Sequence, residues 1–222
     1  MSQEVFIQKL AEQLKKQEWR CSTKIILAGD YVKFRLVKQD GRLDQAESIA
    51  LLRHQFAQVY DKQIQGWSIF LARPSFDKNN IACAVNQQLL TQLQSVFQSA
   101  KVRLVSAEPS LVTWLNKIRK RVPQNGWLAI VDVETVYALK LLAGEVVHLR
   151  EMPIALNLAI AHSDLIEKML AREMMALGDD INTAKVCCYL VEQDAIRSTF
   201  QLNKQAEVLS RHVAQNISVA AV

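Results

Sequence analysis

Hydrophobic positions along the chain follow two spacings, one typical of helices and one typical of strands. Residues 3–18 place apolar side chains three and four positions apart among Gln, Lys and Glu, which predicts an amphipathic helix. Residues 31–37 instead alternate apolar and charged side chains, which predicts a strand. The same reasoning predicts further helices over 43–60, 87–99, 109–121 and 164–177, and a helical tail from about 194 to 215. It predicts further strands over 24–27, 67–71, 81–85, 102–106, 127–131, 135–142, 145–150 and 185–191.

The segment Pro123–Gly126 is the strongest break in this pattern. The predicted order before the break is a helix followed by ββαββαβα, and the order after it is βββαβα. Three antiparallel strands followed by alternating helix and strand are typical of the ribonuclease H-like fold, and two such units in tandem make the actin-like ATPase architecture. We therefore predict an α/β protein with tandem ribonuclease H-like subdomains. The predicted divisions are an N-terminal helix (1–22), a first subdomain (23–122), a second subdomain (127–192) and a C-terminal helical tail (193–222).

Composition and cysteine content indicate an ordinary globular protein of the cytoplasm. The 222 residues are 50% hydrophobic and 22% charged, and no apolar run approaches the roughly 20 residues that cross a bilayer. The N-terminal residues carry charges and glutamines where a secretion signal needs an apolar core. The four cysteines (Cys21, Cys83, Cys187 and Cys188) form no CxxC pair, which predicts neither a disulfide framework nor a zinc site. Cys187 and Cys188 are adjacent on a predicted strand, so their side chains should lie on opposite faces.

The net charge is +5, with an isoelectric point near 9.0. The densest basic run is Lys117–Arg121, at the end of a predicted helix. Two interpretations stay open for this run. It is either a solvated helix end or a contact for an anionic surface, made of lipid headgroups or an acidic protein.

Two predicted hairpin turns are candidates for binding a nucleotide. In an actin-like ATPase, each half offers such a turn to the phosphates, with Asp or Glu beside Gly so that backbone N–H groups come close. Here the first turn contains Gly29 and Asp30, and the second contains Asp132 and Glu134 without any glycine. No Gly-Gly turn follows to cover an adenosine. We therefore expect the nucleotide site to be absent or degenerate, with no cofactor, and keep ATP with Mg²⁺ as the alternative.

The same carboxylates permit a second alternative, a nuclease of the ribonuclease H class. Asp132 and Glu134 are two apart at a strand end and share a side, and such a nuclease needs three or four carboxylates around two metal ions. Glu108 and Asp194 are candidate companions, together with Asp30, but nothing in their spacing requires them to converge. No His or Cys has metal-ligand spacing, so we expect no metal site of that kind.

Several segments together resemble a family of small bacterial assembly proteins. These segments are Gly29–Phe34, Phe56–Tyr60, Gly66-Trp67, Ile81–Val85, Ser106–Leu111, Gly126-Trp127 and Leu170–Glu173. The family comprises the actin-like components of type IV pilus and type II secretion systems, namely PilM, the cytoplasmic part of GspL and MshI. The resemblance covers roughly residues 20–192. It implies a reduced two-lobed actin-like domain at the cytoplasmic face of the inner membrane.

In that family the domain docks a short segment of a bitopic, PilN-like membrane protein. The resemblance therefore implies a non-catalytic assembly or scaffold protein, peripheral at the inner membrane. The aromatic and basic residues around Tyr31 and Phe34 make no RNP-like motif, so we expect no nucleic acid as a partner. A homodimer and an ATP-binding role in the same machinery stay open. No partner-binding residue can be named from the sequence.

Overall fold

The computed structural model describes residues 3–16, 22–27, 29–38, 42–71, 78–132, 135–154, 163–180, 184–191 and 207–208. Its helices are α1 (Gln3–Lys16), α2 (Gln45–Tyr60), α3 (Gln87–Ser99), α4 (Ser110–Ile118) and α6 (Ser163–Ala176). Its strands are β1 (Ser22–Leu27), β2 (Val32–Lys38), β3 (Trp67–Leu71), β4 (Asn79–Asn86), β5 (Arg103–Pro109), β6 (Gly126–Val131), β7 (Thr135–Leu142), β8 (Glu145–Pro153), β9 (Val186–Leu190) and β10 (Glu207–Val208). Short 3₁₀ turns lie at Gly29–Tyr31 (η1), Asp61–Ile64 (η2) and Arg119–Arg121 (η3). The predicted helices before the tail and all predicted strands are present, with ends shifted by a few residues.

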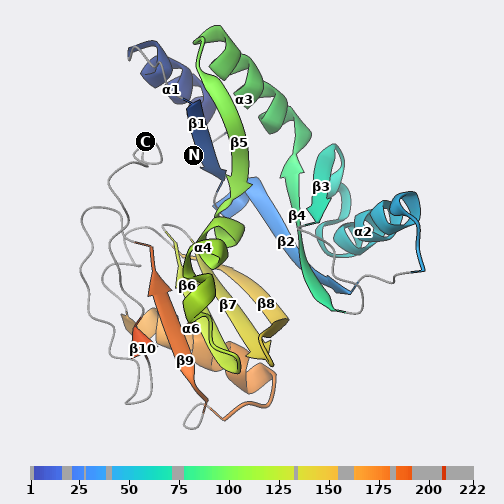
Figure 1. Ribbon diagram of the computed structural model, residues 1–222, viewed down its shortest axis with the longest axis vertical. Helices are drawn as coiled ribbons and strands as arrows, with labels where there is room; N and C mark the ends of the chain where they lie inside the picture. Colours follow the sequence, from blue (N-terminus) through green and yellow to red (C-terminus); the bar gives the residue numbers. More distant parts are fainter. Residues whose placement is uncertain are drawn as a thin grey trace.

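The strands after the break at residues 123–126 form one sheet in the order β10-β9-β6-β7-β8. Strands β6, β7 and β8 are antiparallel neighbours, whereas β9 runs parallel to β6 and β10 parallel to β9. Three antiparallel strands followed by a helix and a parallel strand are the ribonuclease H-like order predicted from the sequence, and β10 adds a strand that was not predicted. We call this sheet with α6 the second lobe, and the elements from α1 to β5 the first lobe (Figure 1).

The first lobe divides its strands between two sheets. Strand β1 pairs in parallel with β5, whereas β2 and β3 both pair antiparallel with β4. The predicted hairpin between residues 24–27 and 31–37 is therefore wrong, because the two strands have different partners. The turn η1, with Gly29 at a φ of 53°, redirects the chain between them.

The C-terminal tail differs from the prediction where it is described. Glu207 and Val208 lie opposite Cys187 and Cys188 as a short parallel strand, so a helix at these two residues is wrong. The open edge of β9 offers backbone hydrogen-bonding groups that a local helical pattern cannot reveal. The rest of the predicted tail helix lies outside the described residues.

The sheet of the second lobe is buried on both faces. Its inner face, toward the first lobe and α4, presents Leu128, Ile130, Tyr137 and Leu139, each fully buried. Its outer face packs on α6 through a separate apolar cluster that includes Trp127, Ala129, Val131, Ile166 and Leu170. Cys187 belongs to the inner cluster and Cys188 to the outer one, which confirms the prediction that they lie on opposite faces.

Helix α2 covers one side of the first lobe, and helices α1 and α3 lie together on another (Figure 1). Helix α2 begins with a capping box between Asp44 and Glu47 and buries Phe56 against the sheet of β2, β4 and β3. Helix α1 lies beside α3, where Gln3 Nε2 donates a hydrogen bond to Gln92 Oε1 at 2.9 Å. The face of the β2-β4-β3 sheet that α2 does not cover contributes to the apolar cluster shared with the second lobe.

Candidate functional site

Two of the predicted nucleotide residues, Gly29 and Asp132, lie at the junction between the two lobes. Gly29 is buried in η1, at the end of the first lobe that meets β7. Asp132 follows β6 directly and is 6% exposed. The side chain of Asp30 and the whole of Glu134 lie outside the described residues, so their assignment as nucleotide ligands stays a prediction.

Tyr137 on β7 joins the two lobes through its hydroxyl and its ring. The hydroxyl shares a buried hydrogen bond of 2.9 Å with Ser110 Oγ, at the first residue of α4. The backbone of Gly29 also hydrogen-bonds to it. The ring meets Phe34 of β2 edge-on, with centroids 5.7 Å apart. Burial raises the pKa of Tyr137 well above its ordinary value, against the opposing hydrogen bond from Ser110, so the group stays a neutral phenol.

Asp132 is held by a tryptophan of α4. Trp114 Nε1 donates a hydrogen bond to Asp132 Oδ2 at 3.2 Å. The backbone N–H of Asp132 donates to the carbonyl of Thr135 at 2.8 Å, which closes the turn between β6 and β7. The Trp114 ring also lies 6.5 Å from that of Tyr189, centroid to centroid. The carboxylate therefore has a structural partner on the neighbouring helix.

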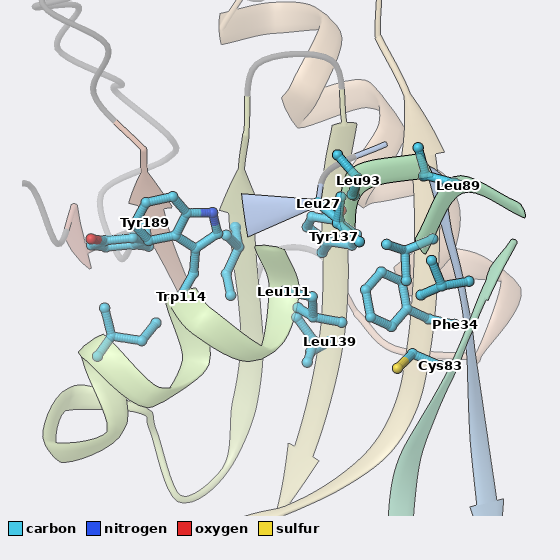
Figure 2. Packing of buried hydrophobic residues seen from close by; sticks show 14 of the residues in the cluster. Leu27, Phe34, Cys83, Leu89, Leu93, Leu111, Trp114, Tyr137, Leu139 and Tyr189 are labelled. Atoms are coloured by element: carbon cyan, nitrogen blue, oxygen red, sulfur yellow. The ribbon is translucent and has the colours of Figure 1, made fainter. Parts of the chain in front are cut away.

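Between the lobes lies a continuous layer of packed side chains (Figure 2). Figure 2 shows Trp114 beside Tyr189 at one side, Tyr137 and Leu139 in the middle, and Phe34 beside Cys83 at the other. We call this set the interlobe layer; its labelled members are Leu27, Phe34, Cys83, Leu89, Leu93, Leu111, Trp114, Tyr137, Leu139 and Tyr189. Each of these side chains is at most 7% exposed.

The structure thus brings Gly29 and Asp132 to the same layer, but surrounds them with residues that sequence reasoning did not assign to the site. None of Ser110, Trp114 and Tyr137 was assigned to the nucleotide site from the sequence. The one available signal was a tyrosine inside the mostly aliphatic strand β7. Its partner Ser110 is 27 residues away in sequence, and local spacing cannot indicate such a pairing.

Glu108, a candidate companion for the nuclease hypothesis, has other partners at the end of β5. Its carboxylate accepts hydrogen bonds from Ser106 (2.9 Å) and Lys24 (3.2 Å), and a longer one from Thr113 (3.5 Å). The hydrogen bond from Ser106 lowers the pKa of Glu108, and Lys24 lowers it further, against partial burial. Within the described part of the chain, no group of three or more His, Cys, Asp or Glu residues could hold a metal ion.

A second polar cluster attaches the end of α6 to the outer face of the sheet. Asp179 accepts hydrogen bonds from Lys140 Nζ at 2.7 Å and Trp127 Nε1 at 2.8 Å. The bond from Lys140 holds the pKa of Asp179 below its ordinary value, with a smaller contribution from Trp127. Glu173 of α6 lies near His148 and Arg150 of β8, at 3.4 and 3.7 Å. These contacts fix a helix to a sheet.

The lobes, their strand order and the layer between them define an α/β protein of the actin-like ATPase fold. The sequence matches no protein-family model, and no curated protein matches it. Among solved structures, the chain is similar to a PilM-PilN type IV pilus biogenesis complex, with a TM-score of 0.58 and 13% identity over 84% of this chain and 67% of that one. It is also similar to the cytoplasmic domain of EpsL, an inner membrane component of the type II secretion system of Vibrio cholerae. That match has a TM-score of 0.56 and 8% identity, and covers 92% of this chain and 76% of the EpsL chain.

These similarities confirm the predicted fold class and the predicted resemblance to pilus and secretion proteins at the level of the fold. Identities this low carry no residue-by-residue assignment. Within the described residues, no helix combines the length and the apolar character needed to cross a membrane.

Proposed function

We propose that this protein is a non-catalytic assembly component of a type IV pilus-like or type II secretion-like machine, held at the cytoplasmic face of the inner membrane by a PilN-like membrane protein. The observation that carries the proposal is the shared fold with two proteins of such machines, one of them described as a complex with PilN. The chain aligns over 84% and 92% of its own length, so the likeness covers both lobes.

The interlobe layer supports a non-catalytic role over the ATP-binding alternative. A nucleotide between the lobes would need polar groups and space beside the two turns. Instead, the faces that meet there are packed with apolar side chains, and Asp132 is engaged by Trp114. Binding a nucleotide at these turns would require the Tyr137 and Trp114 contacts to open.

A hollow beside α2 is our candidate for the docking of the membrane protein. It lies between the N-terminal half of α2 and the ends of β2 and β3, and it is mostly apolar. Its lining residues are Val37, Lys38, Leu43, Ser48, Leu51, Leu52, Gln55 and Leu71. Leu51 is 37% exposed at this hollow, so its side chain can contact a partner directly. The hollow encloses only about 10 Å³, so a short extended segment would lie across its apolar rim.

The test is site-specific photocrosslinking in native cells. A photoreactive amino acid at Leu51 or Lys38, on the rim of the hollow, should crosslink to an inner-membrane protein. The matched control is Met175 on α6, which is 61% exposed on the other lobe and should give no such product. Equal crosslinking from all three positions, or no membrane protein from any of them, would contradict the docking assignment.

Thermal unfolding with and without Mg-ATP separates the proposal from its alternative. A ligand at 100 times its dissociation constant stabilises a protein by about 2.7 kcal/mol, or roughly 5–10 °C for a chain of this size. The proposal expects no shift. A shift of that size, lost on Asp132→Ala, would favour the ATP-binding protein of the same machinery.

A further inference from the structure

The basic run at the end of α4 forms an exposed cationic surface. Ile118 is buried and anchors the end of the helix, and the next three residues form η3. Arg119, Lys120 and Arg121 of η3 are all exposed. A 3₁₀ turn has three residues per turn, so consecutive side chains point in directions about 120° apart. The three cations therefore spread over a surface and do not converge on a single carboxylate or phosphate.

No neighbouring acid neutralises this run in the described residues. The sequence contains no Asp or Glu between Glu108 and Asp132. In the part of the chain that the structure describes, no ion pair involves Arg119, Lys120 or Arg121, whereas Lys24, Lys140 and Arg150 each lie near a carboxylate. Lys117, one turn earlier, instead places its ammonium 4.3 Å from the centre of the Trp114 ring. The three η3 side chains are thus adjacent exposed cations that an outside partner can reach.

An exposed leucine lies on the loop that packs beside the basic turn. The segment after η3 binds the β7–β8 turn, because the N–H of Gly144 donates to the carbonyl of Gln124 at 2.7 Å and the N–H of Ala143 donates to Asn125 Oδ1 at 2.9 Å. Leu142, at the start of this turn, is 50% exposed.

Another cation lies at the same end of the sheet. The N–H of Trp127 donates to the carbonyl of Lys185 at 2.8 Å, and Lys185 is itself exposed. Spread cations beside an exposed apolar side chain are the composition of a surface that rests on anionic lipid headgroups.

We propose that η3, with Leu142 and Lys185 beside it, is a contact surface for the anionic phospholipids of a membrane. Spread, flexible cations favour lipid over an acidic protein, since headgroups rearrange around them and need no preformed geometry. The inference rests on the proposed function in one respect only, namely that the membrane in question is the inner membrane. At that membrane, the η3 surface would orient the protein against the bilayer while the PilN-like membrane protein binds it.

The test is co-sedimentation of the full chain with vesicles of phosphatidylcholine, alone or mixed with phosphatidylglycerol. The chain should bind the mixed vesicles, bind pure phosphatidylcholine poorly, and dissociate at high salt. The triple variant R119Q/K120Q/R121Q should lower the partition coefficient on mixed vesicles by roughly a hundredfold. The control K15Q/K101Q/R103Q removes the same charge from exposed positions in the first lobe and should lower it only a few-fold.

Equal losses in the two triple variants would show that net charge alone drives binding and would overturn the proposal. Failure of the unaltered chain to bind mixed vesicles would also overturn it. Binding to polyglutamate, used as a mimic of an acidic protein, without binding to the vesicles would have the same meaning. Thermal unfolding of both variants checks that they remain folded. Crosslinking from Leu51 in cells carrying R119Q/K120Q/R121Q reports the docking of the membrane protein separately, so failure on vesicles does not count against the proposed function.

Discussion

Replacing Tyr137 by Phe removes one oxygen from the interlobe layer and keeps the ring that packs against Phe34. The hydroxyl that disappears is fully buried, as is its partner Ser110, 2.9 Å away. The hydrogen bond from the backbone of Gly29 to the same oxygen is lost too. Ser110 and Gly29 are then left without this partner in a place that water does not reach.

The expected loss follows from these unsatisfied groups. A buried polar group without its partner costs about 1–3 kcal/mol. For a chain of this length, 1 kcal/mol corresponds to roughly 2–4 °C in the unfolding midpoint. We therefore expect Tyr137→Phe to lower the midpoint by about 4–8 °C, for a loss near 2 kcal/mol. Thermal unfolding followed by circular dichroism measures this loss.

A second substitution separates the hydrogen bond from general damage. Ser110→Ala combined with Tyr137→Phe removes both partners, and replacing both with apolar groups is far less costly than orphaning one. The double variant should therefore lose less stability than the sum of the two single variants, by about 0.5–3 kcal/mol. Additive losses would refute the assignment of a direct bond between these two residues.

Tyr60→Phe is the matched control for the loss of a tyrosine hydroxyl. Tyr60 is only partly buried, and its hydroxyl donates to the carbonyl of Phe34 over 3.4 Å, a long and weak bond. Its removal should cost less than about 1 kcal/mol. If Tyr60→Phe and Tyr137→Phe lower the midpoint equally, the reasoning about the interlobe layer is wrong.

Two further predictions concern the core and a strand end. Burial raises the pKa of Cys83 from 9.0 to about 11, so the folded chain keeps a thiol that the unfolded chain ionises. Stability should be complete below pH 9 and fall as the pH rises toward 11, and urea unfolding of Cys83→Ala should show a shallower fall across that range. Gly126→Ala would place a Cβ atom 2.5 Å from the carbonyl oxygen of Lys185, whereas Gly66→Ala meets nothing within 4 Å. Both glycines have positive φ, so both variants should lose about 1–2 kcal/mol of unfolding free energy, and Gly126→Ala should lose clearly more; equal losses would contradict the close approach.

The second lobe could be predicted from the sequence because its signals are local. Strands β6, β7 and β9 are short apolar runs between turns, and their order along the chain already matches a known topology. The pairing of β1 with β5 could not be predicted in the same way. Parallel strands meet across a long connection, and the turn at Gly29 looks the same in the sequence whether or not it closes a hairpin.

The candidate site could be predicted only in part. The sequence placed Gly29 and Asp132 at turns, and the structure brings both to the interlobe layer. The role expected for Asp132 depended on phosphates, whereas the structure gives its carboxylate an indole partner 18 residues earlier in the chain. Spacing along one strand reports which face a side chain takes, but not what another element places against it.

The burial of the second-lobe sheet on both faces has a consequence for how the protein folds. Without the first lobe, a fragment from β6 to β9 would bare Leu128, Ile130, Tyr137 and Leu139 to water, although its strand order is complete. We therefore expect the two lobes to unfold as a single cooperative unit despite their separate sheets. Either lobe expressed alone should need another apolar surface in place of the missing lobe in order to fold.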